Sequence, residues 1–429
     1  MKNHITVIGS ILVVLLVFSC NNTAKESKID TVKKQKTLHA KDILGNPNYL
    51  AISYGGYRQK SRDSQPTIKE LKSDMKLLSA MGIKIIRTYN VQLQQAPNLL
   101  KAINELKKED ASFEMYVMLG AWIDCLNAWT DQAPNHDVES PNNAAEIDRA
   151  VALANQYPDI VKIIAVGNEA MVKWAASYYV QPNVILKWVN HLQELKKNKK
   201  LPKDLWITSS DDFASWGGGE DQYHVEDLEK LIKTVDYISM HTYPYHNSHY
   251  NPQFWGVPQS EQSLSKVEKI DAAMERAIEF SKRQYDSVKN YMKSIGVNKP
   301  IHIGETGWAS VSNGFYGSNG SKATDEYKQG LYYKLMRAWT NEAGISCFYF
   351  EAFNEQWKDA ENPNGSENHF GLFTIDGKAK YPIWNLVDKA TFKGLTRDGN
   401  PILKTYEGNK DLLIENVLAP PSLNEIMAH

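Results

Sequence analysis

The sequence predicts an α/β fold, a (β/α)8 or TIM barrel, and three observations support this prediction. From Tyr49 onward, short runs of β-branched and aromatic residues alternate with longer segments of helical periodicity, which is typical of parallel strands joined by crossover helices. Eight such runs are present, as many as a barrel of this type contains. Residues 217–219 form a glycine run without the Lys and the spacing of a phosphate loop, which disfavours a nucleotide-binding sheet.

The expected elements follow one another in regular order. The eight strands are expected at residues 50–54, 83–89, 113–119, 161–167, 205–210, 237–242, 301–305 and 346–350. In the first crossover, Thr67 and Glu70 can form a capping box, and Gly82 can end the helix in a left-handed turn. Two later helices should bury the faces formed by Val267, Ile270, Met274, Ala277 and Ile278 and by Tyr327, Leu331, Leu335, Ala338 and Trp339, the second helix ending at Gly344.

The N-terminus has the features of an export signal. Lys2 precedes an apolar run, residues 5–18, that is shorter than the ~18 residues required to span a bilayer. Residues 17–20 resemble a lipoprotein processing site, at which Cys20 becomes the lipidated first residue; an ordinary secretory signal cleaved nearby is the alternative. We expect a signal peptide (1–20), a flexible tether (21–41), a barrel domain (42–390) and a partly ordered C-terminal extension (391–429).

Charge and cysteine content restrict the classes of partner. The chain has 49 Lys plus Arg against 50 Asp plus Glu, a formal net charge of -1, so no summed field would concentrate nucleic acid. A neutral substrate fits this balance better. Besides Cys20, only Cys125 and Cys347 remain, so at most one disulfide can form. Three histidines near the sixth strand match no strong metal-ligand spacing, and we expect neither a metal nor a cofactor; they are His241, His246 and His249.

Two carboxylates close strands of the predicted barrel, where the active sites of this fold lie. Glu169 follows the fourth expected strand and Glu305 ends the seventh. A lone glutamate at such a place is often a helix cap or the partner of an arginine, but two together indicate shared chemistry. Paired carboxyls suit cleavage of a glycosidic bond: a separation of ~5 Å gives retention of configuration and ~6.5–9.5 Å gives inversion. The sequence leaves this distance open.

The residues around both glutamates resemble the signature regions of glycoside hydrolase family 17, in Val-Gly-Asn-Glu (166–169) and Gly-Glu-Thr-Gly-Trp (304–308). The resemblance implies that Glu169 is the acid/base, that Glu305 is the nucleophile and that Asn168 holds a sugar hydroxyl. It continues through residues 86–89, 240–245, 350–358 and 366–373, and covers about 49–384. These segments add Arg87, Tyr89, His241, Tyr243, Glu351, Glu355, Lys358 and Glu367 as candidate substrate-binding residues. Fungal and bacterial members often have Asp where this chain has Asn354.

The resemblance also suggests how the site is tuned. A lysine near Glu305, expected to be Lys358, would keep that carboxylate ionised, whereas Glu169 needs a raised pKa. Arg87 and Tyr89 should orient Glu305 or the sugar. Among the aromatic residues near strand ends, Tyr54, Tyr243 and Trp308 are the ones we expect to contact sugar rings. The weaker candidates are Tyr57, Trp122, Trp174, Trp216, Trp255, Tyr316 and Trp357.

Together these features predict a monomeric, exported enzyme that cleaves β-1,3-glucan internally by double displacement, with retention. Its partner is a β-glucan polysaccharide or oligosaccharide, and it meets the membrane through a lipid anchor only. It is expected at the cell envelope, periplasmic or on the outer-membrane surface, or else secreted. A glucanosyltransferase using the same carboxylates is the first alternative. A glycan-binding lipoprotein without catalysis is an alternative of another class, although it would be expected to lack a carboxylate.

Overall fold

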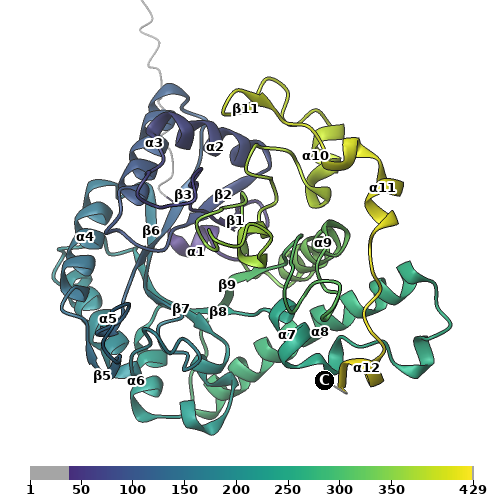
Figure 1. Ribbon diagram of the computed structural model, residues 1–429. Coiled ribbons are helices and arrows are strands. Elements are labelled where there is room, and N and C mark those ends of the chain that lie inside the picture. Colours follow the sequence, from purple (N-terminus) through teal and green to yellow (C-terminus); the bar gives the residue numbers. More distant parts are fainter. Residues whose placement is uncertain (1–37, 428–429) are drawn as a thin grey trace, which may run out of the picture. The chain divides into compact units, whose positions relative to one another are not determined.

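In the computed structural model, which describes residues 38–427, eight parallel strands close into a barrel ringed by helices (Figure 1). The strand order around the ring is β1-β10-β9-β8-β7-β6-β3-β2. The predicted (β/α)8 fold is therefore confirmed, and every expected strand is present. The barrel strands are β1 (Leu50–Ser53), β2 (Ile83–Arg87), β3 (Tyr116–Ala121), β6 (Val161–Asn168), β7 (Trp206–Asp212), β8 (Ile238–His241), β9 (Ile301–Gly307) and β10 (Cys347–Phe350).

Helices connect the strands and cover the outside of the barrel. The longer ones are α2 (Ile68–Ala80), α3 (Gln95–Glu109), α4 (Asn143–Gln156), α5 (Pro182–Lys197), α6 (Glu226–Thr234), α8 (Lys266–Ser294) and α9 (Glu326–Glu342). The start of α2 is as predicted, because the Thr67 hydroxyl accepts from the amide of Glu70 and the Glu70 carboxylate accepts from the amide of Thr67. Its end is also as predicted, since Gly82 adopts a φ of +82°.

The buried face of α9 differs from the predicted one. Leu331 and Leu335 are only partly buried and Ala338 is exposed, whereas Tyr332, Met336, Arg337 and Thr340 are buried. The Arg337 guanidinium donates to the carbonyl oxygens of Ala51 at 2.7 Å and Cys347 at 2.8 Å. This face therefore packs on the barrel partly through a polar side chain that bonds strand carbonyls, which an apolar periodicity cannot reveal.

The amino end of the barrel is closed by the short helix α1 (Ala40–Ile43). Ala40 and Ile43 are fully buried in one cluster with inward-facing strand residues such as Ile85 and Phe348. The tether predicted for 21–41 is therefore wrong for residues 38–41, which belong to the folded unit. The predicted signal peptide, with Cys20, and the rest of the tether lie outside the described residues.

Two parts of the chain contain helices and strands that were not predicted from the sequence. A hairpin of β4 (Cys125–Leu126) and β5 (Asn135–Glu139) projects between β3 and α4. The C-terminal extension carries β11 (Thr396–Arg397), β12 (Asn400–Pro401), α11 (Lys410–Glu415) and α12 (Leu423–Met427), and passes along the outside of the helices from α2 past α9 (yellow in Figure 1). The remaining short helices are α7 (Pro244–Tyr250) and α10 (Trp384–Asp388).

The extension is fastened by buried charges. Asp74 of α2 is fully buried and contacts Arg397 of the extension at 3.2 Å and Arg58 at 2.8 Å.

Cys125 and Cys347 are both buried free thiols. Within residues 38–427, no helix has the length and the apolar character that crossing a bilayer requires.

Candidate active site

Four neighbouring strands bring the candidate residues together at the carboxyl end of the barrel. His241, the last residue of β8, lies beside Glu305 of β9 in the sheet register. Asn168, the last residue of β6, lies beside Ser210 of β7. Glu169 follows Asn168 directly. One carboxylate oxygen of Glu169, one of Glu305 and a ring nitrogen of His241 all lie within 4.8 Å of one another. The two glutamates therefore share one site, as predicted.

The backbone around both glutamates requires particular residues. Gly167 has a φ of +80° and Glu169 a φ of +48°, so the chain turns sharply at the end of β6, and the amide of Glu169 donates to the Ser210 carbonyl at 2.9 Å. Before Glu305, a Cβ atom on Gly304 would lie 2.1 Å from the Ser239 hydroxyl oxygen. Only glycine allows β9 to pack this closely on β8, which fixes where Glu305 projects.

Glu305 is almost fully buried and surrounded by donors. The Arg87 guanidinium and the Tyr89 hydroxyl donate to its Oε2, the latter at 2.7 Å, and the Tyr243 hydroxyl donates to its Oε1 at 2.6 Å. Burial alone would raise the pKa of Glu305. The adjacent Arg87 charge and the tyrosine hydrogen bonds outweigh burial and lower this pKa to about 2. Glu305 is therefore ionised at neutral pH.

Glu169 has the opposite environment. Its Oε1 lies 3.0 Å from Nδ1 of His241, whose Nε2 lies 2.8 Å from the Ser210 hydroxyl. Burial, and then the negative charge of Glu305, raise the pKa of Glu169 to about 8. Burial also lowers the pKa of His241 to about 4, so the imidazole is neutral and adds no charge that would ionise Glu169. Glu169 can thus hold a proton next to an ionised carboxylate.

The other predicted residues of the second strand are also placed at Glu305. Arg87 is buried and divides its guanidinium between Glu305 and the side-chain oxygen of Asn168, with a further bond to the Gly304 carbonyl at 3.0 Å. The Arg87 guanidinium lies over the Tyr89 ring, with 4.7 Å between its Cζ atom and the ring centroid. Arg87 therefore links the segments that carry both glutamates.

The predicted acidic cluster lies beside the pair, but its lysine has another role than expected. Lys358 contacts Glu351, and lies 3.6 Å from Glu355. Burial raises the pKa of Glu367, and Lys358 opposes this shift. The expectation that Lys358 ionises Glu305 is wrong, because Arg87 is the cation in contact with that carboxylate, and Lys358 is occupied by the glutamates of the cluster.

Two aromatic residues expected to contact sugar are core residues instead. The Tyr54 ring is buried and its hydroxyl donates to Asp74 at 2.8 Å. Trp308 is fully buried, its Nε1 donates to the Ala323 carbonyl at 2.8 Å, and its ring packs on those of Tyr245 and Trp255. Neither ring has a free face, so both predictions are wrong. Tyr243, the third, does lie at the site.

The sequence analysis missed two buried or partly buried carboxyl groups at the end of β7, those of Asp211 and Asp212. Asp211 is fully buried and accepts from the amides of Met171 and Asp212, both at 2.8 Å. Burial is the main cause that raises the pKa of Asp211 to about 7. Because Met171 follows Glu169 by two residues, Asp211 holds the loop that carries Glu169. The signal that found Glu169, a polar residue closing a strand, also applies to Asp211.

One group among the described residues has donors that could hold a cation: Glu169, His241 and Glu305. Both ring nitrogens of His241 already lie within hydrogen-bond distance of a partner, and Glu305 is neutralised by Arg87. Binding a metal would break these contacts. The arrangement fits proton transfer better than metal binding.

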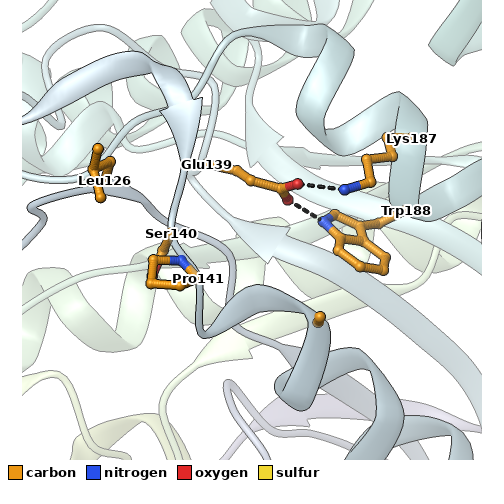
Figure 2. Close-up of a pocket in the computed structure, with 7 residues that line it drawn as sticks. Leu126, Glu139, Ser140, Pro141, Lys187 and Trp188 are labelled. Atoms are coloured by element: carbon orange, nitrogen blue, oxygen red, sulfur yellow. Dashed lines mark hydrogen bonds and ion pairs between the residues drawn. The ribbon is translucent and has the colours of Figure 1, made fainter.

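A surface pocket of about 290 Å³ lies apart from this site, between the β4–β5 hairpin, α4 and α5 (Figure 2). Glu139 reaches across it to the Lys187 ammonium and accepts from Nε1 of Trp188 at 2.7 Å. The pocket contains none of the residues around Glu169 and Glu305. Its carboxylate is already paired, so its evident role is to fasten the hairpin to α5.

Comparison with known proteins extends these observations. The model of the BtgE/BtgC glycoside hydrolase domain family matches residues 51–371. The crystal structure of an endo-laminarinase from Formosa Hel1_33_131 is 70% identical in sequence and superposes with a TM-score of 0.89, covering 90% of this chain and 98% of that chain. A glycoside hydrolase family 17 β-1,3-glucanosyltransferase from Rhizomucor miehei, 21% identical, shares the fold with a TM-score of 0.53 over 78% of this chain and 96% of that chain.

Two curated fungal proteins are more distant relatives. A glucan 1,3-beta-glucosidase of Arthroderma benhamiae is 24% identical over 62% of this chain and 70% of that protein. A putative glucan endo-1,3-beta-glucosidase, btgC of Aspergillus niger, is 24% identical over 70% of this chain. The match spans only 37% of the length of the Aspergillus niger protein.

Proposed function

Because the chain belongs to the BtgE/BtgC family of glycoside hydrolases, which confirms the predicted kinship with glycoside hydrolase family 17, we propose that it cleaves β-1,3-glucan internally and retains the anomeric configuration. The observation that carries this proposal is the pair of carboxyl groups with opposite pKa shifts, with an oxygen of each within 4.8 Å. Retaining enzymes need their carboxyl groups ~5–5.5 Å apart, whereas inverting enzymes leave room for a water at ~6.5–9.5 Å.

Two displacements at one anomeric carbon account for the products. Glu305 attacks this carbon and forms a glycosyl ester while Glu169 gives its proton to the leaving glycosidic oxygen, which departs as a sugar hydroxyl. Glu169, now ionised, takes a proton from water, and the water oxygen displaces Glu305 from the anomeric carbon. Both carboxyl groups then return to their starting protonation states. Tyr243, which bonds Glu305, and Asn168, which bonds the same Arg87 guanidinium as Glu305, would contact hydroxyls of the sugar that is attacked.

The substrate class rests on the relatives. The Formosa protein, similar over nearly its whole length, is an endo-laminarinase, and laminarin is a β-1,3-glucan. Transfer of the glycosyl group to a sugar instead of water, as in the Rhizomucor glucanosyltransferase, uses the same pair. Products longer than a laminari-oligosaccharide substrate would indicate transfer. The alternative of another class, a glycan-binding protein without catalysis, does not explain why one carboxyl is kept protonated beside an ionised one.

The test separates the two roles. Glu305→Gln should lose activity on every substrate, because no nucleophile remains. Glu169→Gln should lose activity on laminarin but still release an aryl group that departs without a proton. Glu326→Gln is the matched control, since Glu326 is a buried glutamate of α9 bound to Thr405, and it should keep full activity. Near-normal laminarin turnover by either active-site variant contradicts the proposal, and NMR of the first product gives its anomeric configuration.

The cellular context is proposed on the sequence alone. An exported monomer anchored through a lipid on Cys20 agrees with the N-terminal pattern. In Cys20→Ala, the protein should leave the membrane fraction. If the distribution does not change, the secretory alternative replaces this proposal.

A further inference from the structure

Three aromatic side chains pack together beside the site, and we call them the platform; they are Trp129, which is exposed, Trp122, which is partly buried, and Tyr178, which is buried. Trp129 stacks on Tyr178 with ring centroids 5.0 Å apart and an interplanar angle of 23°. Trp122 lies against both, 5.2 Å from Tyr178 and 6.4 Å from Trp129. Trp129 nevertheless remains 63% exposed. Trp129 is thus held against another ring while most of its surface stays accessible to a ligand that can stack on it.

The platform is adjacent to Glu169. Ala121 pairs with Val166 in the sheet, so Trp122 lies beside Gly167, two residues before Glu169. Tyr178 belongs to the loop that begins at Glu169, and the Val180 amide returns to the Ala170 carbonyl at 2.7 Å. Burial raises the pKa of the Tyr178 hydroxyl, and the nearby Glu169 carboxyl adds to this shift. The rings and the acid/base candidate therefore share one rim of the barrel.

The β4–β5 hairpin holds Trp129 in place. The amide of Cys125, at the start of the hairpin, donates to the Tyr178 carbonyl at 3.1 Å. At its other end, Glu139 is fastened to α5 through Lys187 and Trp188 (Figure 2). Trp129 itself has a φ of +61°, in the left-handed region that non-glycine residues rarely adopt. Such a conformation persists where the surroundings fix it, which makes the platform a formed feature of the fold.

We propose that this platform stacks glucosyl units on the leaving-group side of the scissile bond, and that it holds the acceptor sugar when the glycosyl group is transferred rather than hydrolysed. This inference rests on the proposed glucanase function. One face of a β-glucose ring exposes only C–H groups, which pack on aromatic rings. Asp124, which accepts from Nε1 of Trp122 at 3.3 Å, supplies a carboxylate for sugar hydroxyls at the edge of the platform.

The side is assigned from the position of the acid. Glu169 protonates the leaving oxygen, so the sugars beyond that oxygen extend away from Glu305 over the rim formed after β3 and β6. A second exposed aromatic group lies after β8 and β9, where His249 stacks on Phe315 with centroids 4.3 Å apart. In the strand order, β3 and β9 lie diametrically opposite. This second group is therefore on the opposite rim and serves as an internal control.

The test compares Trp129→Ala with the wild-type chain on laminaripentaose and on an aryl β-laminaribioside. Trp129→Ala should raise KM for laminaripentaose about tenfold, the effect of losing one ring contact. At equal conversion it should also form fewer products longer than the substrate, measured by mass spectrometry. Hydrolysis of the aryl substrate should not change, because its leaving group is too short to reach the platform. Trp129→Phe, which keeps a ring, should restore most of the affinity.

Phe315→Ala is the matched control, because Phe315 is 58% exposed and lies on the opposite rim. It should leave the fraction of longer products unchanged. An unchanged KM for laminaripentaose in Trp129→Ala overturns the inference, and so does an equal loss on both substrates, since that indicates a structural role. If the wild-type chain cleaves neither substrate, the proposed function itself fails. Thermal unfolding of each variant confirms that it is folded.

Discussion

Replacing Arg87 by Met tests the electrostatic basis of the site. Arg87 is the one cation in contact with Glu305 among the described residues, and its guanidinium also bonds Asn168. Methionine keeps much of the side-chain volume but removes the charge and the donors. Two hydrogen bonds to Glu305 remain, from Tyr89 at 2.7 Å and Tyr243 at 2.6 Å. Glu305 should therefore still ionise, but less readily.

The size of the shift follows from these contacts. A hydrogen bond to a charged group contributes ~1.5–3 kcal/mol, and one pKa unit corresponds to ~1.36 kcal/mol, so the pKa of Glu305 should rise by about 1–2 units. Activity requires ionised Glu305 and is lost as the pH falls through its pKa. The acidic limb of the pH profile should therefore move upward by the same amount. At the pH optimum, kcat/KM should fall by about 10²–10³-fold, as when a positioned electrostatic partner is removed.

The assay is the pH dependence of kcat/KM on laminarin, followed by reducing-end release. Arg87→Lys should show a smaller shift, because an ammonium keeps the charge but not the fork of donors. Arg337→Met is the matched control: this arginine is also buried, but it donates to backbone carbonyls of β1 and β10. It should lower stability without moving the acidic limb. A folded Arg87→Met enzyme with an unmoved acidic limb refutes the reasoning.

Three further predictions concern charge. Glu305→Gln removes the negative charge beside Glu169, so the pKa of Glu169 should fall from about 8, which carbon NMR of labelled glutamate can follow. Asp74→Asn leaves the buried Arg397 guanidinium without a carboxylate partner and removes the nearest carboxylate from Arg58. Arg58 keeps Asp398 at 3.5 Å and Glu70 at 3.8 Å, so the loss falls mainly on Arg397 and should cost about 3–5 kcal/mol of unfolding free energy, with little change in activity at low temperature. Burial lowers the pKa of Lys380 to about 7, so above pH 7 the unfolded chain binds more protons and wild-type stability rises toward the ordinary pKa of lysine. Asn354→Asp places a carboxylate where Lys380 now donates at 2.8 Å and should flatten that rise, measured by urea unfolding across pH.

The barrel and the carboxyl pair were predictable because each leaves a local trace in the sequence. Each buried strand is a short apolar run, and Glu169 and Glu305 follow or end such runs. Parallel strands bring their carboxyl ends together whatever the loops do. Asp211 leaves a weaker trace, because Thr208, Ser209 and Ser210 stand directly before it instead of an apolar run.

The positions of side chains in the loops after the strands were less predictable. Tyr54 and Trp308 both follow barrel strands, as Tyr243 does, yet only Tyr243 reaches the site. The difference lies in what covers them: Tyr54 meets Asp74 of α2, and Trp308 is covered by residues far along the chain. The prediction of the buried face of α9 was wrong for a related reason. Arg337 is buried because it bonds carbonyl groups of strands that lie far away in the sequence.

The coupling between the two carboxyl groups explains how one site can use Glu169 first as an acid and then as a base. The negative charge of Glu305 raises the pKa of Glu169, and neutral His241 does not offset it. When Glu305 forms the glycosyl ester, that charge disappears while Arg87 remains, so the pKa of Glu169 must fall. Glu169 therefore loses its proton at the step that consumes it, and becomes a base at the step that requires one. No movement of the side chains is needed, because the bond at Glu305 itself changes the field at Glu169.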